Sequence, residues 1–439
     1  MGKRLRMIIR INNYTMKEEQ IDSIIRLIKR EVVPAIGCTE PAAVSLCVAK
    51  ATETLGRCPE KISLKLSGNI IKNAMGVGIP GTGMIGLPIA VALGALVGKS
   101  EYGLEVLRDV DSEAIEAGKR YIAEDRIHID HHKNPPSILH IEVAVEADGH
   151  KAFAVISGSH TNFIRIVKDE EVLFEKSCDE ASAGESDEEL TEAIVYEFAT
   201  TAPIEKLRFI LESATMNRHA AELALNSNFG HCLGSVLRSD GRRIFGETPL
   251  ERIISTTSAA CDARMGGAPV AVMSNSGSGN QGITTTLPVA CYAEEIGADD
   301  DTLARALILS HLTSIYIKQS LGRLSGLCGC VTASTGAAAG VTWLMGGGYD
   351  QVCAAIKNMV ANLTGMICDG AKPACSMKIA SGVSTAMMSA LLAVNGKCVS
   401  SQEGIVCDDI DTTIHNLTSI GRDAMTETDH LVLDIMVSK

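Results

Sequence analysis

The spacing of apolar residues near the start of the chain predicts the first helices. Apolar residues recur every three or four positions over residues 18–33, which is typical of an amphipathic helix. A second helix is expected over residues 42–55, after a turn that contains Cys38. Thr39 suits the N-cap of that helix, and Pro41 suits its first turn because the missing N–H is not needed there. Cys38 is therefore expected at a helix N-terminus.

Alternating apolar and polar positions predict a small antiparallel sheet. Residues 61–66 alternate like a strand, and residues 138–156 are typical of a hairpin whose turn lies at residues 147–150. A further strand is expected near residues 163–167. The histidine-rich segment 128–132 runs into a proline pair, and we expect it to be a solvated helix end rather than a metal site.

From residue 191 the pattern is helical almost to the end of the chain. Glycine clusters interrupt it at residues 274–282, 325–330, 346–348 and 365–370. The predicted fold class is α+β, with a mainly helical Gly/Ala-rich catalytic core and a smaller antiparallel-sheet domain. The expected domains are N-terminal helices packing on the core (16–58 and 75–126), a sheet-containing domain (59–74 and 135–190) and a helical catalytic domain (191–439).

Composition narrows the class of partner. Of the 439 residues, 46% are hydrophobic and 21% are charged, which fits a packed globular protein and excludes a disordered chain. The formal net charge of −13 opposes attraction to nucleic acid, so a small-molecule partner is expected. Only 3% of the residues are aromatic while 40 are glycine, which favours closely packed helices with small side chains.

The sequence favours a cytoplasmic location without a membrane partner. The longest apolar stretch, residues 84–97, contains glycine and proline and is shorter than the about 20 residues of a membrane-spanning helix. The N-terminus has basic residues without the apolar stretch of a signal peptide. A homodimer is left open. In a reducing compartment the 14 cysteines are not expected to form disulfides.

Most of the cysteines are expected to be small buried hydrophobic residues. This set is Cys47, Cys58, Cys178, Cys232, Cys261, Cys291, Cys353, Cys398 and Cys407. The other five lie in glycine- or proline-rich sequence, which is typical of metal-binding loops: Cys38, Cys328, Cys330, Cys368 and Cys375. The C-x-x-C pairs of a closed zinc site are missing. Loop thiols from two segments instead suit an iron–sulfur cluster in which one iron stays open as a Lewis acid.

A polar glycine-rich loop is the second candidate site. Residues 274–282 (SNSGSGNQG) present hydroxyls, amides and N–H groups before an expected helix, which suits a substrate carboxylate. The residues expected to bind substrate are Ser276, Gly277, Ser278, Gly279 and Asn280. A purely structural interhelical loop is the alternative. The G-x-G-x-x-G match here is not expected to bind a dinucleotide, because no second strand follows to present an acid to a ribose.

Five motifs follow one another along the chain, at residues 37–43 (GCTEPAA), 78–83 (GIPGTG), 276–282 (SGSGNQG), 328–330 (CGC) and 365–375 (GMICDGAKPAC). Over residues 17–435 the chain resembles the L-cysteine desulfidase family, which is related to the alpha chain of iron–sulfur L-serine dehydratases. The resemblance implies that Cys328, Cys368 and Cys375 hold a [4Fe–4S] cluster with one open iron site. It also implies that Cys38 is an additional active-site cysteine, either a base or a fourth ligand, and it leaves the role of Cys330 open.

The resemblance implies a carbon–sulfur lyase that converts L-cysteine to pyruvate, ammonia and sulfide, with L-serine dehydration as the near alternative. We expect the pKa of the Cys38 thiol to be lowered, because it lies at the positive end of a helix dipole. Two alternatives come from other classes. One is a pyridoxal-phosphate lyase with Lys318, Lys372 or Lys378 as the Schiff-base lysine. The other is a non-catalytic iron–sulfur redox sensor.

Overall fold

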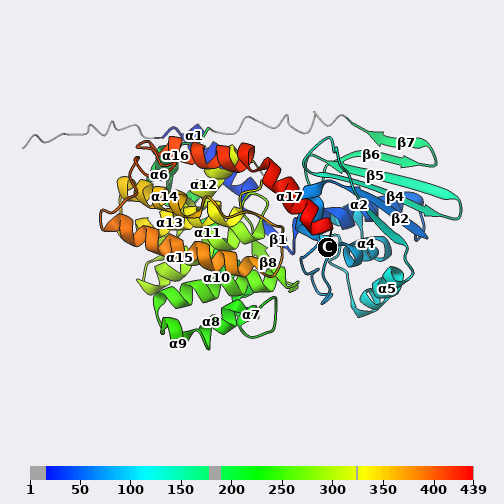
Figure 1. The fold of residues 1–439 in the computed structure, drawn as a ribbon, viewed down its shortest axis with the longest axis horizontal. Helices are drawn as coiled ribbons and strands as arrows, with labels where there is room; N and C mark the ends of the chain where they lie inside the picture. The colour runs from blue at the N-terminus through cyan, green and yellow to red at the C-terminus, as the bar shows by residue number, and fades with distance from the viewer. Residues whose placement is uncertain (1–15, 177–188, 323–324, 439) are drawn as a thin grey trace, which may run out of the picture.

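A computed structural model describes residues 16–176, 189–322 and 325–438 of the chain. In these residues a helical part and a sheet-bearing part lie side by side (Figure 1). The α+β fold class predicted from the sequence is confirmed. The domain boundaries given above stay a prediction.

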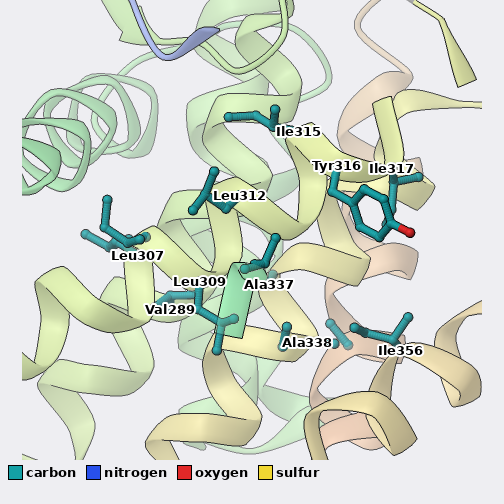
Figure 2. Packing of buried hydrophobic residues seen from close by; sticks show 14 of the residues in the cluster. Val289, Leu307, Leu309, Leu312, Ile315, Tyr316, Ile317, Ala337, Ala338 and Ile356 are labelled. Atoms are coloured by element: carbon teal, nitrogen blue, oxygen red, sulfur yellow. The ribbon is translucent and has the colours of Figure 1, made fainter. Parts of the chain in front are cut away.

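The helical part consists of α1 and the helices after residue 190, of which the last, α17, reaches the sheet-bearing part (Figure 1). Their bounds are α1 Glu18–Glu31, α6 Glu192–Thr201, α7 Leu211–Leu225, α8 Leu233–Arg238, α9 Arg242–Phe245, α10 Pro249–Met265, α11 Gly279–Glu295, α12 Asp300–Leu321, α13 Gly329–Leu344, α14 Tyr349–Leu363, α15 Cys375–Val394, α16 Ile410–Ser419 and α17 Thr426–Val437. Figure 2 shows Leu309 and Leu312 of α12 close to Ala337 of α13. A Cβ added to Gly336 would lie 2.2 Å from the carbonyl oxygen of Ser310. Small residues therefore let these helices approach closely, as the composition predicts.

The sheet-bearing part contains a six-stranded sheet in the order β3-β2-β4-β5-β6-β7. The strands are β2 Lys61–Leu66, β3 Ile127–His131, β4 His140–Ala147, β5 His150–Ser157, β6 Phe163–Lys168 and β7 Glu171–Glu175. The helices of this part are α2 Thr39–Leu55, α3 Gly68–Ala74, α4 Leu87–Leu96 and α5 Ser112–Ala123. The predicted strand at 61–66, the hairpin and the strand after it are confirmed. Residues of α2, α4 and the sheet share one buried apolar cluster.

One strand departs from the predicted antiparallel arrangement. β3 pairs in parallel with β2, whereas β4 pairs antiparallel with β2. The connection from β2 to β3 passes through α3, α4 and α5, and such a crossover returns the chain in the same direction. The expectation of a helix end at residues 128–132 is wrong. Ile127 and Ile129 alternate there with His128 and Asp130, which is the period of a strand.

A two-stranded antiparallel sheet ties the N-terminal segment to the helical part. β1 Pro34–Ile36 pairs with β8 Ala271–Met273. The N–H of Ser276 donates to the carbonyl oxygen of Glu31 (2.9 Å), and Oγ1 of Thr39 donates to that of Gly277 (3.5 Å). The N-terminus of α2 therefore lies beside the polar loop that follows β8.

The cysteines expected in the core fall into several groups. Cys47 and Cys261 are buried, as predicted. The half-buried ones are Cys232, Cys291, Cys353 and Cys407. Cys58 and Cys398 are exposed, so the prediction is wrong for them; both lie in connections between elements, which run over the surface. Cys178 lies outside the described residues.

Among the described residues one helix, α15, is long and apolar enough to cross a membrane by length and composition. It packs against α10, α13 and α14 in the helical part. The apolar stretch at residues 84–97 forms the shorter helix α4, most of whose residues are buried.

A buried carboxyl group lies at the start of α6. Glu192 has no exposed surface, and its Oε1 accepts a hydrogen bond from Oγ1 of Thr313 (2.9 Å). Its Oε2 is buried and has no hydrogen-bond partner among the described residues. Burial, together with the charge of Asp411, raises the pKa of Glu192 to about 8.

This carboxyl group should make stability depend on pH. The folded state holds this proton more tightly than the unfolded state does, because the ordinary pKa is 4.5. The contribution of Glu192 to stability is therefore complete at low pH and is lost as the pH rises towards 8. Glu192→Gln removes this titrating group. The free energy of unfolding of the variant, relative to that of the wild type, should therefore rise by about 3 kcal/mol between pH 5 and pH 8. Denaturant titrations at both pH values measure this gain. Glu197→Gln in the same helix is the control and should gain nothing; an equal gain in both variants would contradict the raised pKa.

Candidate active site

Two chain segments bring the predicted cluster cysteines together. Cys328 is the N-cap of α13, Cys375 is the first residue of α15, and Cys368 lies in the loop before α15. The N–H of Cys328 donates to the carbonyl oxygen of Met366 (2.9 Å), and the N–H of Cys368 donates to that of Gly326 (2.7 Å). This short pairing of the two backbones holds Cys328 and Cys368 next to each other.

The thiols lie close enough to affect one another's ionisation. Burial raises the pKa of Cys328 well above its ordinary value, and the thiols of Cys330 and Cys368 add to the rise. Burial also raises the pKa of Cys375, against the opposing effect of the Lys372 N–H and ammonium group. Such thiols ionise when a metal replaces their protons. Neighbouring thiols of this kind fit the ligand set of an iron–sulfur cluster.

Cys330 is the second residue of α13, two positions after Cys328. Its thiol donates to the carbonyl oxygen of Lys378 on α15 (3.1 Å), and burial raises its pKa to about 12. The residue also lines the cavity described below. Its role therefore stays open, as in the sequence.

The predicted substrate loop turns sharply before α11. Ser276 and Gly277 have φ values of 48° and 79°, and Ser278 is the N-cap of α11 through its hydroxyl. A Cβ added to Gly282 would lie 1.9 Å from the carbonyl oxygen of Met273, so only glycine lets α11 begin this close to β8. The loop presents the N–H groups of a helix N-terminus, which favour an anion.

A buried histidine supports this loop from behind. The Nδ2 atom of Asn275 lies 3.0 Å from Nδ1 of His311 and donates to its carbonyl oxygen (3.2 Å). Oγ1 of Thr286 lies 3.0 Å from Nε2 of the same ring. Burial lowers the pKa of His311 to about 3, so the ring is neutral at physiological pH. These bonds hold the loop without adding charge.

Arg264 is a site residue that the sequence analysis missed. It lies in the last turn of α10 with only 3% of its surface exposed, and its Nη1 donates to Oδ1 of Asn280 (3.0 Å). Its Nε atom is buried and has no hydrogen-bond partner among the described residues. A buried guanidinium beside a loop of N–H groups suits a carboxylate. An arginine at a helix end has an ordinary explanation in the helix dipole, which is why its position gave no signal.

Cys38 is the N-cap of α2, and Thr39 is the first helical residue rather than the N-cap. The Cys38 thiol donates to Oε2 of Glu40 (2.9 Å), which also accepts a hydrogen bond from Oγ1 of Thr39 (3.1 Å). Burial, reinforced by the charge of Glu40, raises the pKa of Cys38 well above its ordinary value. The prediction of a lowered pKa is therefore wrong, because loss of hydration and a neighbouring carboxylate outweigh the helix dipole.

One cavity of about 570 Å³, between the helical and the sheet-bearing parts, is bordered by the loop, Arg264, Cys38, Glu40 and the predicted cluster cysteines. The predicted site residues that line it are Cys38, Ser276, Gly277, Ser278, Asn280, Cys328, Cys368 and Cys375. Gly279 is not among the lining residues. The basic side chains in the lining are Lys72, Arg264, Lys318 and Lys378, and Glu40 is the acidic one. The cavity wall is therefore basic, although the chain as a whole is acidic.

Comparison with known proteins identifies the family. A family model described as serine dehydratase alpha chain matches residues 101–434. The chain belongs to this family. It is similar to the UPF0597 proteins of Bacteroides fragilis and Bacteroides thetaiotaomicron, each 59% identical over 429 residues that cover 97% of this chain and 100% and 99% of theirs. It is 42% identical to the UPF0597 protein of Aeromonas hydrophila over 434 residues, which cover 98% of this chain and 99% of that one.

The serine dehydratase match contains the loop and the predicted cluster cysteines, but it begins after Cys38 and Glu40. The UPF0597 relatives cover nearly the whole chain. Cys38 and Glu40 reach the cavity through the pairing of β1 with β8, which lies partly outside the matched range. The relationship to the serine dehydratase alpha chain expected from the sequence is confirmed. The names of these proteins do not show the L-cysteine desulfidase activity.

Proposed function

We propose that the protein converts L-cysteine and one water molecule to pyruvate, ammonia and hydrogen sulfide, with L-serine dehydration as the alternative. The observation that carries this proposal is that three thiols, a basic wall and a loop suited to carboxylates border the same cavity. Membership of the serine dehydratase alpha chain family supports an iron–sulfur amino-acid lyase. The cysteine substrate rests on the resemblance to the desulfidases and on the affinity of iron for sulfur.

Cys328, Cys368 and Cys375 would hold the [4Fe–4S] cluster, which when bound supplies a Lewis acid for the leaving group. The chain itself would bind and orient the substrate. The Arg264 guanidinium and the N–H groups at the start of α11 would hold the substrate carboxylate between them. The basic wall would exclude cationic competitors and favour an anionic group.

Glu40 is the candidate acceptor for the α-proton of the substrate. Its Oε2 accepts hydrogen bonds from both Cys38 and Thr39, which hold the carboxylate in one orientation at the cavity wall. Cys38 stays protonated and positions this oxygen. Once the α-proton and the β-substituent have left, the remaining 2-aminoacrylate hydrolyses to pyruvate and ammonia.

The other classes find less support. A Schiff base requires a neutral amine, but Lys372 and Lys378 both form ion pairs with Asp369. Lys318 lines the cavity from the last turn of α12 and is the remaining lysine for a pyridoxal site. A redox sensor accounts for the thiols but does not require the buried Arg264 beside the loop.

The test is an assay of anaerobically reconstituted protein with L-cysteine and with L-serine, in which pyruvate and sulfide are both measured. We expect equal amounts of pyruvate and sulfide from L-cysteine. Pyruvate from L-serine without sulfide from L-cysteine would assign the dehydratase reaction instead. A yellow protein whose activity is lost on borohydride treatment, with no bound iron, would assign a pyridoxal lyase.

Replacing Arg264 tests the carboxylate site. Arg264→Lys should raise KM for the amino acid about 10- to 100-fold, because a charged hydrogen bond contributes about 1.5–3 kcal/mol and lysine lacks the paired donors of arginine. Bound iron should stay at the wild-type level. Arg252→Lys in the same helix is the control; its side chain pairs with Glu295 and does not line the cavity. An unchanged KM in Arg264→Lys would remove Arg264 from the proposed site.

A further inference from the structure

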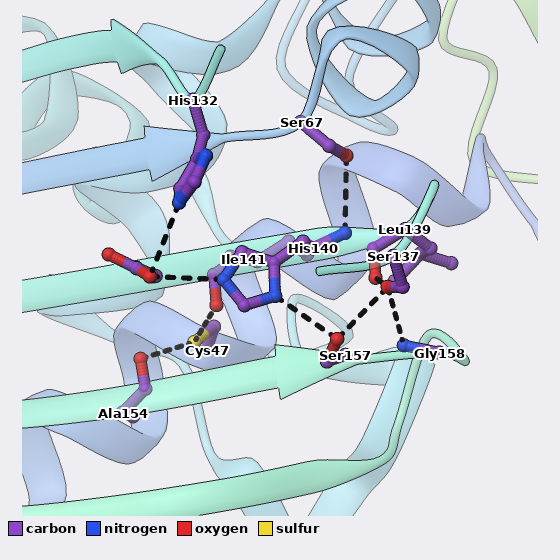
Figure 3. Close-up of polar contacts among 11 residues, drawn as sticks. Cys47, Ser67, His132, Ser137, Leu139, His140, Ile141, Ala154, Ser157 and Gly158 are labelled. Atoms are coloured by element: carbon purple, nitrogen blue, oxygen red, sulfur yellow. Dashed lines mark hydrogen bonds and ion pairs between the residues drawn. The ribbon is translucent and has the colours of Figure 1, made fainter. Parts of the chain in front are cut away.

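A second cluster of metal-ligand side chains lies in the sheet-bearing part. His132 follows the end of β3, and His140 and Glu142 lie on β4, which β2 separates from β3 in the sheet. The candidate ligand atoms of these three residues all lie within 4.8 Å of one another. Figure 3 shows the rings of His132 and His140 close together, and they meet edge to face with centroids 5.4 Å apart. The proposed function uses none of the three.

The distances from Glu142 to the two imidazole rings suit three ligands of one ion. Nε2 of His140 lies 3.0 Å from Oε1 of Glu142, and Nε2 of His132 lies 3.8 Å from the same oxygen. The second distance is too long for a hydrogen bond. Neighbouring ligands of a tetrahedral zinc ion, each at about 2.1 Å from the metal, lie about 3.4 Å apart. The two observed distances bracket that value.

The second ring nitrogen of His140 has a hydrogen-bond partner, as in many metal sites. Its Nδ1 lies 3.1 Å from Oγ of Ser157, which in turn lies 2.9 Å from Oγ of Ser137 (Figure 3). A metal-binding histidine usually uses its other nitrogen for such a contact, which leaves Nε2 for the ion. Nδ1 of His132 is buried without a hydrogen-bond partner among the described residues.

We propose that His132, His140 and Glu142 bind one divalent transition-metal ion such as Zn²⁺. Two imidazoles and one carboxylate are donors that zinc takes, whereas Mg²⁺ and Ca²⁺ prefer oxygen alone. The side chains of His132 and Glu142 are 24% and 26% exposed, so an ion enters from solvent and keeps a position for water. Ser137 also lines the cavity, so the ion would fix part of the cavity wall through Ser157.

The test measures zinc per chain after equilibrium dialysis of the full-length protein. Wild type should hold one zinc more than His132→Ala and one more than Glu142→Gln. His128→Ala is the matched control on β3, since its side chain is 67% exposed and lies outside the cluster; it should bind as the wild type does. Zinc held by cysteines is common to all these proteins and cancels in the difference. Ser157→Ala should weaken this zinc about 10-fold.

Thermal unfolding gives an independent readout, because an ion that binds the folded state raises Tm. Added Zn²⁺ should raise Tm further in wild type and in His128→Ala than in His132→Ala and Glu142→Gln. These variants spare His140, whose side chain is 3% exposed and contributes to the fold of β4. Equal zinc content and equal Tm shifts in wild type and His132→Ala would overturn the site.

Discussion

Serine in place of Cys328, Cys368 or Cys375 is expected to abolish both bound iron and turnover in anaerobically prepared protein. A serine hydroxyl is a poor substitute for a thiolate at iron, and each of the three thiols borders the same cavity. Iron, acid-labile sulfide and the visible spectrum measure the loss. Cys353→Ser and Cys398→Ser are matched controls outside the cavity lining, and both should keep full iron.

Cys330, close to Cys328, provides a further comparison variant for this experiment. Its thiol donates to the carbonyl oxygen of Lys378, and a serine hydroxyl can donate there as well. Cys330→Ser should therefore keep its iron. Full iron in Cys328→Ser together with loss of iron in Cys330→Ser would make Cys330 the cluster ligand in place of Cys328. Full iron in Cys368→Ser would contradict the proposed cluster.

Local sequence patterns predicted much of the fold because they depend on period and turn chemistry. The strand at 61–66 and the hairpin that follows it have regular alternation, and both are found. The direction of β3 could not be predicted in this way, since it depends on where three intervening helices return the chain. The same segment was predicted as a helix end because its histidines and the following prolines masked a short alternation of Ile127 and Ile129.

The residues that line the candidate site were predictable where the local sequence carries a signal. Glycine- and proline-rich loops marked Cys328, Cys368 and Cys375, and all three line the cavity. No local sequence pattern singles out Arg264, because its proposed role depends on burial against a loop from another segment. The pairing of β1 with β8 likewise brings Glu40 to the cavity, and no local pattern predicts which strands of two distant segments will meet.

The net charge of the chain does not predict the charges that line the cavity. The net charge of −13 describes the whole chain, but the charged side chains that line the cavity are four basic ones and one acidic one, Glu40. Two of its lysines are paired with aspartates outside the lining, Lys72 with Asp429 and Lys378 with Asp369. Arg264 has a neutral partner in Asn280. The local field that a substrate meets thus depends on which charges the fold leaves without an acidic partner.

The contact with Glu40 should lower the reactivity of the Cys38 thiol. Because burial and Glu40 raise the pKa of this thiol, it should react with iodoacetamide far more slowly than the exposed Cys58 and Cys398. This expectation reverses the one drawn from its helix-terminal position. Peptide mapping of the alkylated protein measures the order of reaction, and early labelling of Cys38 would contradict the raised pKa.

Cys38→Ala should keep the iron of the wild type and lose turnover by about 100-fold or more, the scale of an acid–base contribution. The protein ligands of the cluster remain, but Glu40 loses the thiol donor 2.9 Å from its Oε2. Cys38→Ser separates the proposed positioning role from the role of fourth iron ligand that the sequence left open. A serine hydroxyl restores a donor to Glu40, so a positioning role predicts substantial turnover in Cys38→Ser, whereas a role as iron ligand predicts that it stays as inactive as Cys38→Ala. Near-normal turnover in Cys38→Ala at normal iron content would show that the thiol only supports the fold, and the proton acceptor would then have to act without it.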